Sequence, residues 1–232
     1  MAKKKTDNRS LYEVPLAFLD VETTGLDHLE ERVTEIACMV RDPDGTVRTS
    51  CSWLVNPGRI LSDEVIELTG ITNEMLLDAP SFGQIYSGLA DIIPEDAIAV
   101  AYNAEFDRRF IGAEICRLGR GTPRFIQETV PWIDPMVMVK AKDPYAKGKG
   151  RFKLGVTAER YGIVVEEAHR ALADVVTLAA VFDKLQPFVT KLFGNDVPTI
   201  YKYDLRQKIL RAQQDANFLQ WLSQRPPLPD EE

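Results

Sequence analysis

The sequence predicts an α/β domain built on a mixed sheet, and three observations predict it. An apolar run at residues 17–19 leads into Asp20 and ends before Gly25, which is typical of a buried strand. Two further β-like segments, at residues 32–40 and 46–55, are joined by a strong Asp-Pro-Asp-Gly turn signal, so we expect an antiparallel three-strand beginning. Short apolar segments at residues 97–102 and 130–133 alternate with helix-like segments and bring the expected strands to five.

Capping and stop signals predict the helices. Ser62 opens a short helix that Gly70 stops, and Asn103 is expected to cap a helix over residues 104–118. Other helices are expected at residues 81–93, from Asp134-Pro135 onward, at 154–161, at 168–185 and after Asp204. We expect a flexible N-terminal end at 1–13, a main domain at 14–186 and a helical extension at 187–232.

The C-terminal extension shows an apolar stripe at helical spacing, formed by Leu205, Ile209, Ala212, Ala216 and Leu219. We expect this stripe to pack on the main domain, although a partner protein would bury it as well.

Composition limits the partners and the compartment. The chain of 232 residues has a net charge of −7, so contact with a polyanion requires a local basic patch. Cys38, Cys51 and Cys116 lack metal-ligand spacing and are expected in the core, which fits a reducing cytoplasm. The basic N-terminus is not followed by an apolar segment, and no run is long and apolar enough to span a membrane.

Two acidic residues end the first strand. Residues two apart in a strand share a face, so Asp20 and Glu22 are expected to point the same way. Adjacent carboxylates repel each other, and a divalent cation is the simplest compensation. Taken alone, the pair could equally face water at a frayed strand end, or Asp20 could be the nucleophile of a phosphotransferase.

Three more ionisable residues stand near helix starts. Asp107 lies four residues after Asn103 on the same helix face, where plain helix-start chemistry also accounts for a carboxylate. His169 and Asp174 can converge only if His169 lies at or just before the start of its helix. A histidine at that place suits proton transfer, but by itself it also fits an ordinary surface position.

One strongly basic stretch covers residues 140–153 and contains mobile glycines and two aromatic side chains, Tyr145 and Phe152. We expect it to contact phosphates and bases of a nucleic acid, with a solvated loop as the alternative. Its cations are Lys140, Lys142, Lys147, Lys149, Arg151 and Lys153, against the single acid Asp143.

Three motifs in order resemble those of the DnaQ-like 3′→5′ exonucleases, in the His variant of the DEDD group. They are DVETTGL at residues 20–26, NAEFD at 103–107 and HRALAD at 169–174. The resemblance covers residues 14–186, in a family that includes the proofreading (epsilon) subunit of the bacterial replicative DNA polymerase. It implies a ribonuclease H-like fold with a mixed five-stranded sheet flanked by helices.

The resemblance also implies a two-metal hydrolysis. Asp20, Glu22 and Asp174 are implied to hold one Mg²⁺ or Mn²⁺ ion, and Asp20 to bridge to a second ion that Asp107 supports. Two such ions about 4 Å apart stabilise the charges that develop as a phosphodiester is attacked by water. His169 is implied as the general base. The product is expected to be a 5′-mononucleotide cut from the 3′ end.

Substrate contacts are implied for the positions that match the family's substrate-side residues: Thr23, Thr24, Gly25, Leu26, Asn103 and Phe106. For Phe106, core packing explains the residue equally well. The sequence departs from the family pattern at Tyr102 and Thr69, where the family commonly has His. Neither position is a metal ligand, so these departures affect the expected nucleotide preference rather than the expected activity.

Several functional hypotheses stay open at this point. The first is an exonuclease acting on single-stranded DNA, in proofreading or repair, with a polymerase or replication partner bound through the C-terminal extension. The second is an enzyme that trims RNA 3′ ends, which differs in whether the site admits a 2′-hydroxyl. The third is a catalytically silent module that binds nucleic acid or tethers a polymerase.

Overall fold

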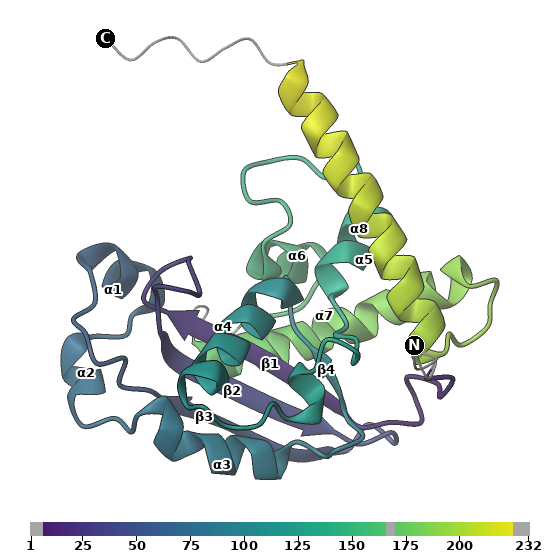
Figure 1. The fold of residues 1–232 in the computed structure, drawn as a ribbon. Helices are drawn as coiled ribbons and strands as arrows, with labels where there is room; N and C mark the ends of the chain where they lie inside the picture. Colours follow the sequence, from purple (N-terminus) through teal and green to yellow (C-terminus); the bar gives the residue numbers. More distant parts are fainter. Residues whose placement is uncertain (1–6, 166–169, 225–232) are drawn as a thin grey trace, which may run out of the picture.

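A four-stranded mixed sheet forms the centre of the molecule (Figure 1). The computed structural model describes residues 7–165 and 170–224. The strands are β1 (Leu16–Thr23), β2 (Val33–Arg41), β3 (Val47–Leu54) and β4 (Ile98–Val100), in the spatial order β3-β2-β1-β4. β1, β2 and β3 pair antiparallel, and β4 runs parallel to β1, so the antiparallel beginning and the mixed sheet are confirmed.

The expected fifth strand at residues 130–133 is wrong. In the described part of the chain, this segment makes one parallel bridge, between Ile133 and Val100. Pro131 has no N–H to continue a ladder. Trp132 directs its ring N–H to the carbonyl oxygen of Phe125 at 2.6 Å, which fixes the segment against a neighbouring loop instead.

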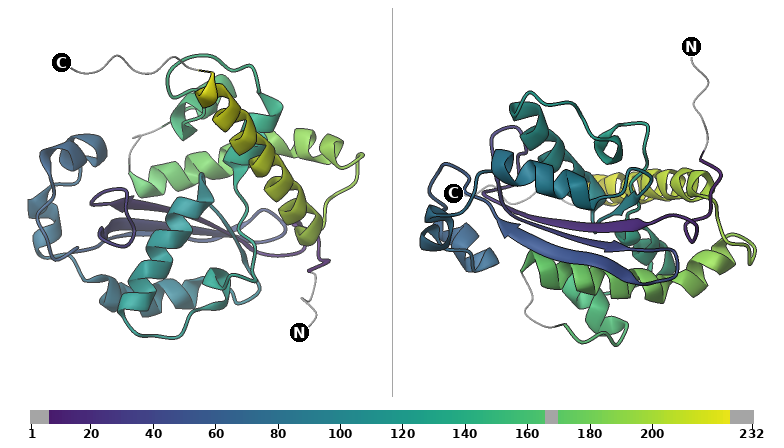
Figure 2. Two further views of the ribbon diagram at one scale, coloured as in Figure 1. Left: turned by 45° about the horizontal axis from the view of Figure 1, so that its top comes forward. Right: turned by 90° about the horizontal axis from the view of Figure 1, so that it is seen from below.

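Helices cover both faces of the sheet (Figure 2). They are α1 (Asp63–Thr69), α2 (Asn73–Leu77), α3 (Phe82–Ile92), α4 (Ala104–Arg117), α5 (Pro135–Lys142), α6 (Leu154–Arg160), α7 (Ala171–Leu192) and α8 (Ile200–Ser223), with a 3₁₀ turn at Arg124–Ile126. α2 and the 3₁₀ turn were not expected. α7 continues past its expected end because Leu185 and Val189, on either side of Pro187, are buried in the core.

The two faces of β1 pack against different helices. Leu16 and Phe18 belong to the core cluster that contains residues of α5, α6 and α7. Ala17, Leu19 and Val21 belong to the cluster that contains residues of α3 and α4. Side chains alternate along a strand, so Asp20 and Glu22 share the face of Phe18 and point to the α7 side of the sheet.

The C-terminal helix α8 packs on the domain through a different face from the expected stripe. Tyr203 is buried and Gln207 nearly so, whereas Leu205, Ile209 and Leu219 are between 43% and 64% exposed. α8 begins at Ile200, so Asp204 lies inside the helix and pairs with Lys208 at 2.6 Å rather than capping it. The far end of α8 extends away from the sheet (Figure 1).

The chain ends and the cysteines also differ from expectation. Within the N-terminal end expected to be flexible, Leu11 is buried and Ser10 bridges to Thr199, so this part is packed on the domain. All three cysteines are free, but only Cys38 is buried, and Cys116 is exposed. Among the described residues, no helix has the length and apolar character needed to cross a bilayer.

Candidate metal centre

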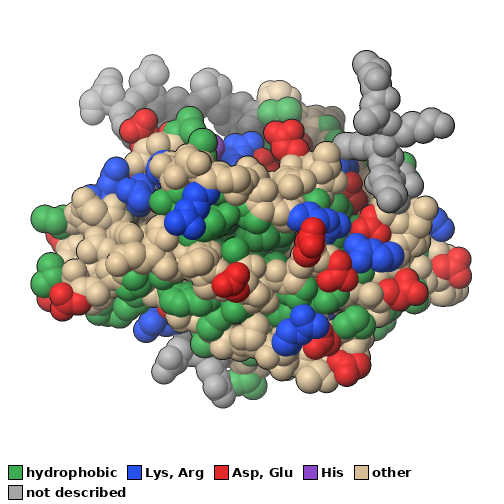
Figure 3. Space-filling view, turned by 60° about the horizontal axis from the view of Figure 1, so that its bottom comes forward, with side chains coloured by type: hydrophobic (Ala, Val, Ile, Leu, Met, Phe, Trp, Pro, Cys, Tyr) green, Lys and Arg blue, Asp and Glu red, His purple; other side chains and the backbone are tan. Residues whose placement is uncertain are grey.

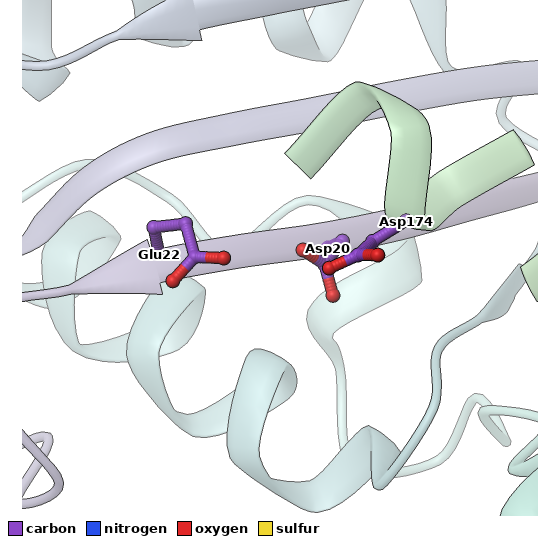
Figure 4. A group of neighbouring side chains, drawn as sticks. All are labelled: Asp20, Glu22 and Asp174. Carbon is purple, nitrogen blue, oxygen red and sulfur yellow. The ribbon is translucent and has the colours of Figure 1, made fainter. Parts of the chain in front are cut away.

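Three carboxylates meet at the end of β1. Asp20 and Glu22 come from β1, and Asp174 comes from the first turn of α7, which crosses the same face of the sheet (Figure 4). One carboxylate oxygen of each residue lies within 4.8 Å of the others. The alternative in which Asp20 and Glu22 simply face water at a frayed end is therefore wrong.

The fourth predicted acid, Asp107, reaches β1 from α4, and its charge acts on Asp20. It lies in the first turn of α4 and is 3% exposed. Its Oδ1 atom accepts a hydrogen bond from the backbone N–H of Val21, between Asp20 and Glu22, at 3.1 Å. Because β1 and β4 are parallel, the carboxyl ends of both strands lie at one edge of the sheet, and this brings α4 to the cluster.

The carboxylates raise one another's pKa values. Burial, followed by the charges of Asp107, Asp174 and Glu22, raises the pKa of Asp20 well above its usual value. Burial and the charge of Asp174 raise the pKa of Glu22 to about 8, which Arg170 opposes only in part. Burial raises the pKa of Asp107 as well, although the hydrogen bond from Val21 opposes the shift. Without a cation, it is therefore unfavourable for all of these carboxylates to be ionised at neutral pH.

The cluster fits a divalent cation. Carboxylate oxygens are the ligands that Mg²⁺ and Mn²⁺ prefer. Ligands about 2.1 Å from an ion lie about 3 to 4 Å from one another, so oxygens within 4.8 Å of one another are near enough for one ion to be held between them after small side-chain movements. A bound cation would also remove the mutual repulsion that raises these pKa values. The donor set and the spacing are therefore those of a metal centre.

A fifth buried acid, Glu35, adjoins the cluster and was not predicted from the sequence. It is 1% exposed and lies directly opposite Glu22 in the pairing of β1 with β2. Its carboxylate accepts hydrogen bonds from the Arg170 guanidinium, at 3.3 and 3.4 Å, and from the backbone N–H of Ala171, at 3.3 Å. Glu35 thus fixes the start of the helix that holds Asp174. Its signal in the sequence was a charged residue inside an otherwise apolar strand.

His169 lies outside the described residues. The described chain resumes at Arg170, the N-cap of α7, so the helix begins at Ala171. The prediction that His169 converges with Asp174 therefore stays a prediction.

The loop after β1 is fixed by local contacts. The Thr23 hydroxyl donates a hydrogen bond to the carbonyl oxygen of Gly25 at 2.6 Å, and Thr24 donates to Glu31. A Cβ atom at Gly25 would lie 2.9 Å from Glu31, so the close approach of these residues requires glycine. Leu26 projects into solvent and is 86% exposed.

Asn103 and Phe106 lie at the start of α4. Asn103 is exposed and has a left-handed backbone, with φ 67° and ψ 48°, and its side chain makes no capping hydrogen bond. Asn103 is the N-cap residue of α4 as expected, but the capping bond expected of its side chain is not formed. The Asp134 carboxylate accepts the N–H groups of Asn103 and Ala104. Phe106 packs on Phe110 with ring centroids 4.7 Å apart, so it has a packing role.

A groove of 540 Å³ adjoins Asn103 on the side of the basic stretch. Its lining includes three cationic residues, Lys140, Arg151 and Lys153, together with Phe152. Two cations make cation–π contacts with the Phe152 ring: the Arg151 Cζ atom lies 5.1 Å and the Lys140 Nζ atom 6.0 Å from the ring centroid. Elsewhere, acidic and basic side chains are interspersed, as on the face in Figure 3. The groove therefore gathers positive charge next to Asn103, at the start of α4.

Two positions that depart from the family pattern have structural contacts. The Tyr102 hydroxyl lies 3.0 Å from the Thr157 hydroxyl of α6. Thr69 is buried, donates to the Val65 carbonyl at 2.9 Å and accepts the Ile71 N–H at 3.2 Å. Both residues are thus engaged in packing within the domain.

Comparisons with known proteins agree with this geometry. A family model described as an exonuclease (RNase_T) matches residues 17–182. The chain is also similar to a PolC-type DNA polymerase III of Staphylococcus haemolyticus, with 34% identity over 185 residues, which is 80% of this chain. The matched region spans 12% of the length of that polymerase.

Solved structures share the fold. Exonuclease X, in complex with 5′-overhanging duplex DNA, is 24% identical with a TM-score of 0.60, and the match covers 82% of this chain and 99% of that one. A zinc-bound Escherichia coli exonuclease I complex with single-stranded DNA is 18% identical with a TM-score of 0.66, covering 78% and 42% of the two chains. The ribonuclease H-like fold class is thereby confirmed, with four strands in the sheet rather than five.

Proposed function

Since this chain belongs to the exonuclease family, we propose that it is a metal-dependent 3′→5′ exonuclease that hydrolyses DNA and releases 5′-mononucleotides. The observation that supports this most is the convergence of Asp20, Glu22 and Asp174 within 4.8 Å, with Asp107 bonded to the strand between the first two. Binding modules have no need of four acids gathered at the end of one strand, where they repel one another. A catalytically silent module and a phosphotransferase are therefore disfavoured.

In the proposed site, Asp20, Glu22 and Asp174 hold one Mg²⁺ or Mn²⁺ ion, and Asp107 supports a second. Such ions, when bound, stabilise charge on the phosphate and on the departing 3′ oxygen. Asp107 has one oxygen engaged by Val21, which orients the carboxylate. Glu35 holds the start of α7, so that Asp174 faces β1 rather than solvent.

We assign the general base to His169, which would accept the proton of the attacking water. The assignment rests on the third motif, HRALAD at residues 169–174, which also contains Asp174 of the cluster.

The substrate is proposed to be single-stranded DNA with a free 3′ end. The terminal nucleotide would lie against Thr23, Thr24, Gly25 and Leu26 on one side and Asn103 and Phe106 on the other. The preceding phosphates would reach the basic groove at Lys140, Arg151 and Lys153. Phe152 offers a ring for stacking.

The biological setting is proposed from the relatives. Similarity to PolC-type DNA polymerase III favours a role in proofreading or repair and a location in the cytoplasm. We propose residues 14–186 as the exonuclease domain and 187–232 as a helical extension. The exposed Phe218, Leu219 and Trp221 of α8 favour contact with a polymerase or replication partner.

Digestion of matched DNA and RNA oligomers labelled at the 5′ end tests the proposal. With Mg²⁺ or Mn²⁺ we expect a ladder of DNA products shortened from the 3′ end, and with EDTA no products. Faster digestion of RNA would assign the enzyme to RNA 3′-end trimming instead. Intact oligomers of both kinds, at ample metal concentration, would overturn the proposal.

A further inference from the structure

The C-terminal helix α8 is joined to the start of α4 by a buried polar network. At its centre is Asp134, which is 1% exposed and forms the N-cap of α5. Its Oδ1 atom accepts the Asn103 N–H at 3.1 Å and the Met136 N–H at 3.0 Å, and its Oδ2 atom accepts the Ala104 N–H at 3.2 Å. One carboxylate therefore holds the N-termini of two helices.

α8 contacts both the side chain and the backbone of Asp134. The Arg211 guanidinium donates a hydrogen bond to Oδ2. Gln207 accepts the Asp134 N–H at 3.1 Å and donates to the Trp132 carbonyl at 2.6 Å. Gln214 donates to the Val137 carbonyl at 3.0 Å. These three α8 residues are four and three positions apart, so they share one face of the helix.

The network ends at the proposed substrate and metal site. Asn103 has a left-handed backbone, a conformation that persists in a non-glycine residue when its surroundings fix it. Asp134 supplies that constraint by accepting the N–H groups of Asn103 and of the next residue. One turn later, Asp107 of the same helix is bonded to Val21 between Asp20 and Glu22.

We propose that Arg211 and Gln207 are positioning residues: acting through Asp134, α8 holds Asn103 and the first turn of α4 in the geometry that the reaction uses. The C-terminal helix is then part of the active site's support and not only a surface for partners. The kinetic consequence rests on the proposed exonuclease function, whereas the structural coupling does not. An aliphatic side chain at position 211 leaves Asp134 without its cationic partner in a buried position, which weakens its hold on both N–H groups.

Arg211→Met in the full chain is the test, with Lys208→Met as the matched control. Lys208 lies on the same helix, and its ammonium group pairs with Asp204 of α8 itself. Arg211→Met should speed hydrogen exchange at the Asn103 and Ala104 amides by about tenfold and leave amides of β2 unchanged. It should lower kcat/KM about tenfold, while the affinity of the tighter Mn²⁺ site stays within about twofold of the wild type.

Arg211→Lys keeps a cation beside Asp134 and should restore part of both effects. Gln207→Leu removes the acceptor of the Asp134 N–H and should speed exchange at the Asp134 amide. If Arg211→Met does not fold, Arg211→Lys and Gln207→Leu provide the same comparison with Lys208→Met. Exchange at Asn103 and Ala104 equal to that of the Lys208→Met control would overturn the proposal. Hydrogen exchange tests the coupling of α8 to α4 even if the wild type has no nuclease activity. The positioning role of α8 and the proposed exonuclease function can therefore fail separately.

Discussion

The Oδ1 atom of Asp107 accepts the backbone N–H of Val21 at 3.1 Å, so the second acidic motif is bonded to the strand at the point between Asp20 and Glu22. The contact joins residues 86 positions apart in the chain. It places a buried carboxylate beside the Asp20–Glu22 pair. A displacement of the start of α4 therefore acts directly on the candidate metal centre.

Asp107→Asn removes the charge of this residue and keeps a side-chain oxygen that can accept its hydrogen bond from Val21. The amide oxygen can still accept the Val21 N–H, but the variant cannot support a second cation. We expect activity to fall at least about a hundredfold, with the melting temperature in EDTA equal to or above that of the wild type, because a buried charge has been removed. Asp107→Ala loses the acceptor as well and should be destabilised by about 1–3 kcal/mol. Steady-state kinetics and thermal unfolding measure both, and wild-type turnover in the Asn variant would contradict the assigned role.

The metal-free protein should become less stable as the pH rises. Burial and Asp174 raise the pKa of Glu22 to about 8 in the folded state, above the 4.5 of an unperturbed glutamate. Between these values the folded state binds more protons than the unfolded state, so the free energy of unfolding falls with increasing pH. Melting temperatures in EDTA should decrease from pH 6 to pH 8.5.

Mg²⁺ or Mn²⁺ should reverse this trend. Because the carboxylates must be ionised to bind a cation, the stabilisation by metal should increase with pH, and binding should release protons. Glu22→Gln is the control, and its stability in EDTA should depend less on pH. A wild-type melting temperature that rises with pH in EDTA is the result that contradicts the account.

Glu35→Gln should weaken the attachment of α7 to the sheet. The variant loses the charge that accepts hydrogen bonds from Arg170 and the Ala171 N–H, and Asp174 lies three residues further on. We expect a loss of about 1–3 kcal/mol in the free energy of unfolding and a weaker affinity for Mn²⁺.

Asp183→Asn is a matched control, since Arg41 and Asp183 also join β2 to α7, at 2.8 Å but with Asp183 exposed. It should change stability by less than about 1 kcal/mol and leave Mn²⁺ affinity unchanged. Equal effects of the two substitutions would remove Glu35 from the support of the metal centre.

The basic groove and the neighbouring exposed lysines can be distinguished by salt dependence. Neutralising Lys140, Arg151 and Lys153 should weaken single-strand binding and reduce the slope of log affinity against log salt by about 2. Neutralising Lys147 and Lys149, which do not line the groove, should reduce it less. Fluorescence anisotropy with a labelled oligomer in EDTA measures both slopes. An unchanged slope in the groove variant would show that residues 140–153 are a solvated loop that does not bind the phosphates of the oligomer.

The sequence was sufficient where local pattern determines structure. Alternation in β1 predicted that Asp20 and Glu22 share a face, and the breaks at Gly70 and at Asp134-Pro135 bound the helices as expected. The three motifs together predicted the fold class, and they contain the three carboxylates that meet at the end of β1, Asp20, Glu22 and Asp174. In each case, the information lies within a few residues or in a match of several motifs in order.

The sequence was insufficient where distant groups compete for a partner. Asn103 occupies the N-cap position of α4 as expected, but its side chain makes no capping bond, and Asp134, 31 positions away, binds the first N–H groups of the helix start. The apolar stripe of α8 faces outward because another face of the helix binds the buried Asp134, Arg211 at its carboxylate and Gln207 at its backbone N–H, and no local pattern reveals this. Pro131 prevented a fifth strand, and a stricter use of its missing N–H would have predicted this.

Calorimetric titration of Mn²⁺ into the metal-free wild type and into Asp20→Asn tests the central claim most directly, because Asp20 faces all the other acids of the cluster. The account predicts binding of divalent cations by the wild type, with proton release, and loss of that binding in Asp20→Asn, which should melt no lower than the wild type in EDTA. Equal Mn²⁺ binding by the two proteins, or none by either, would contradict it.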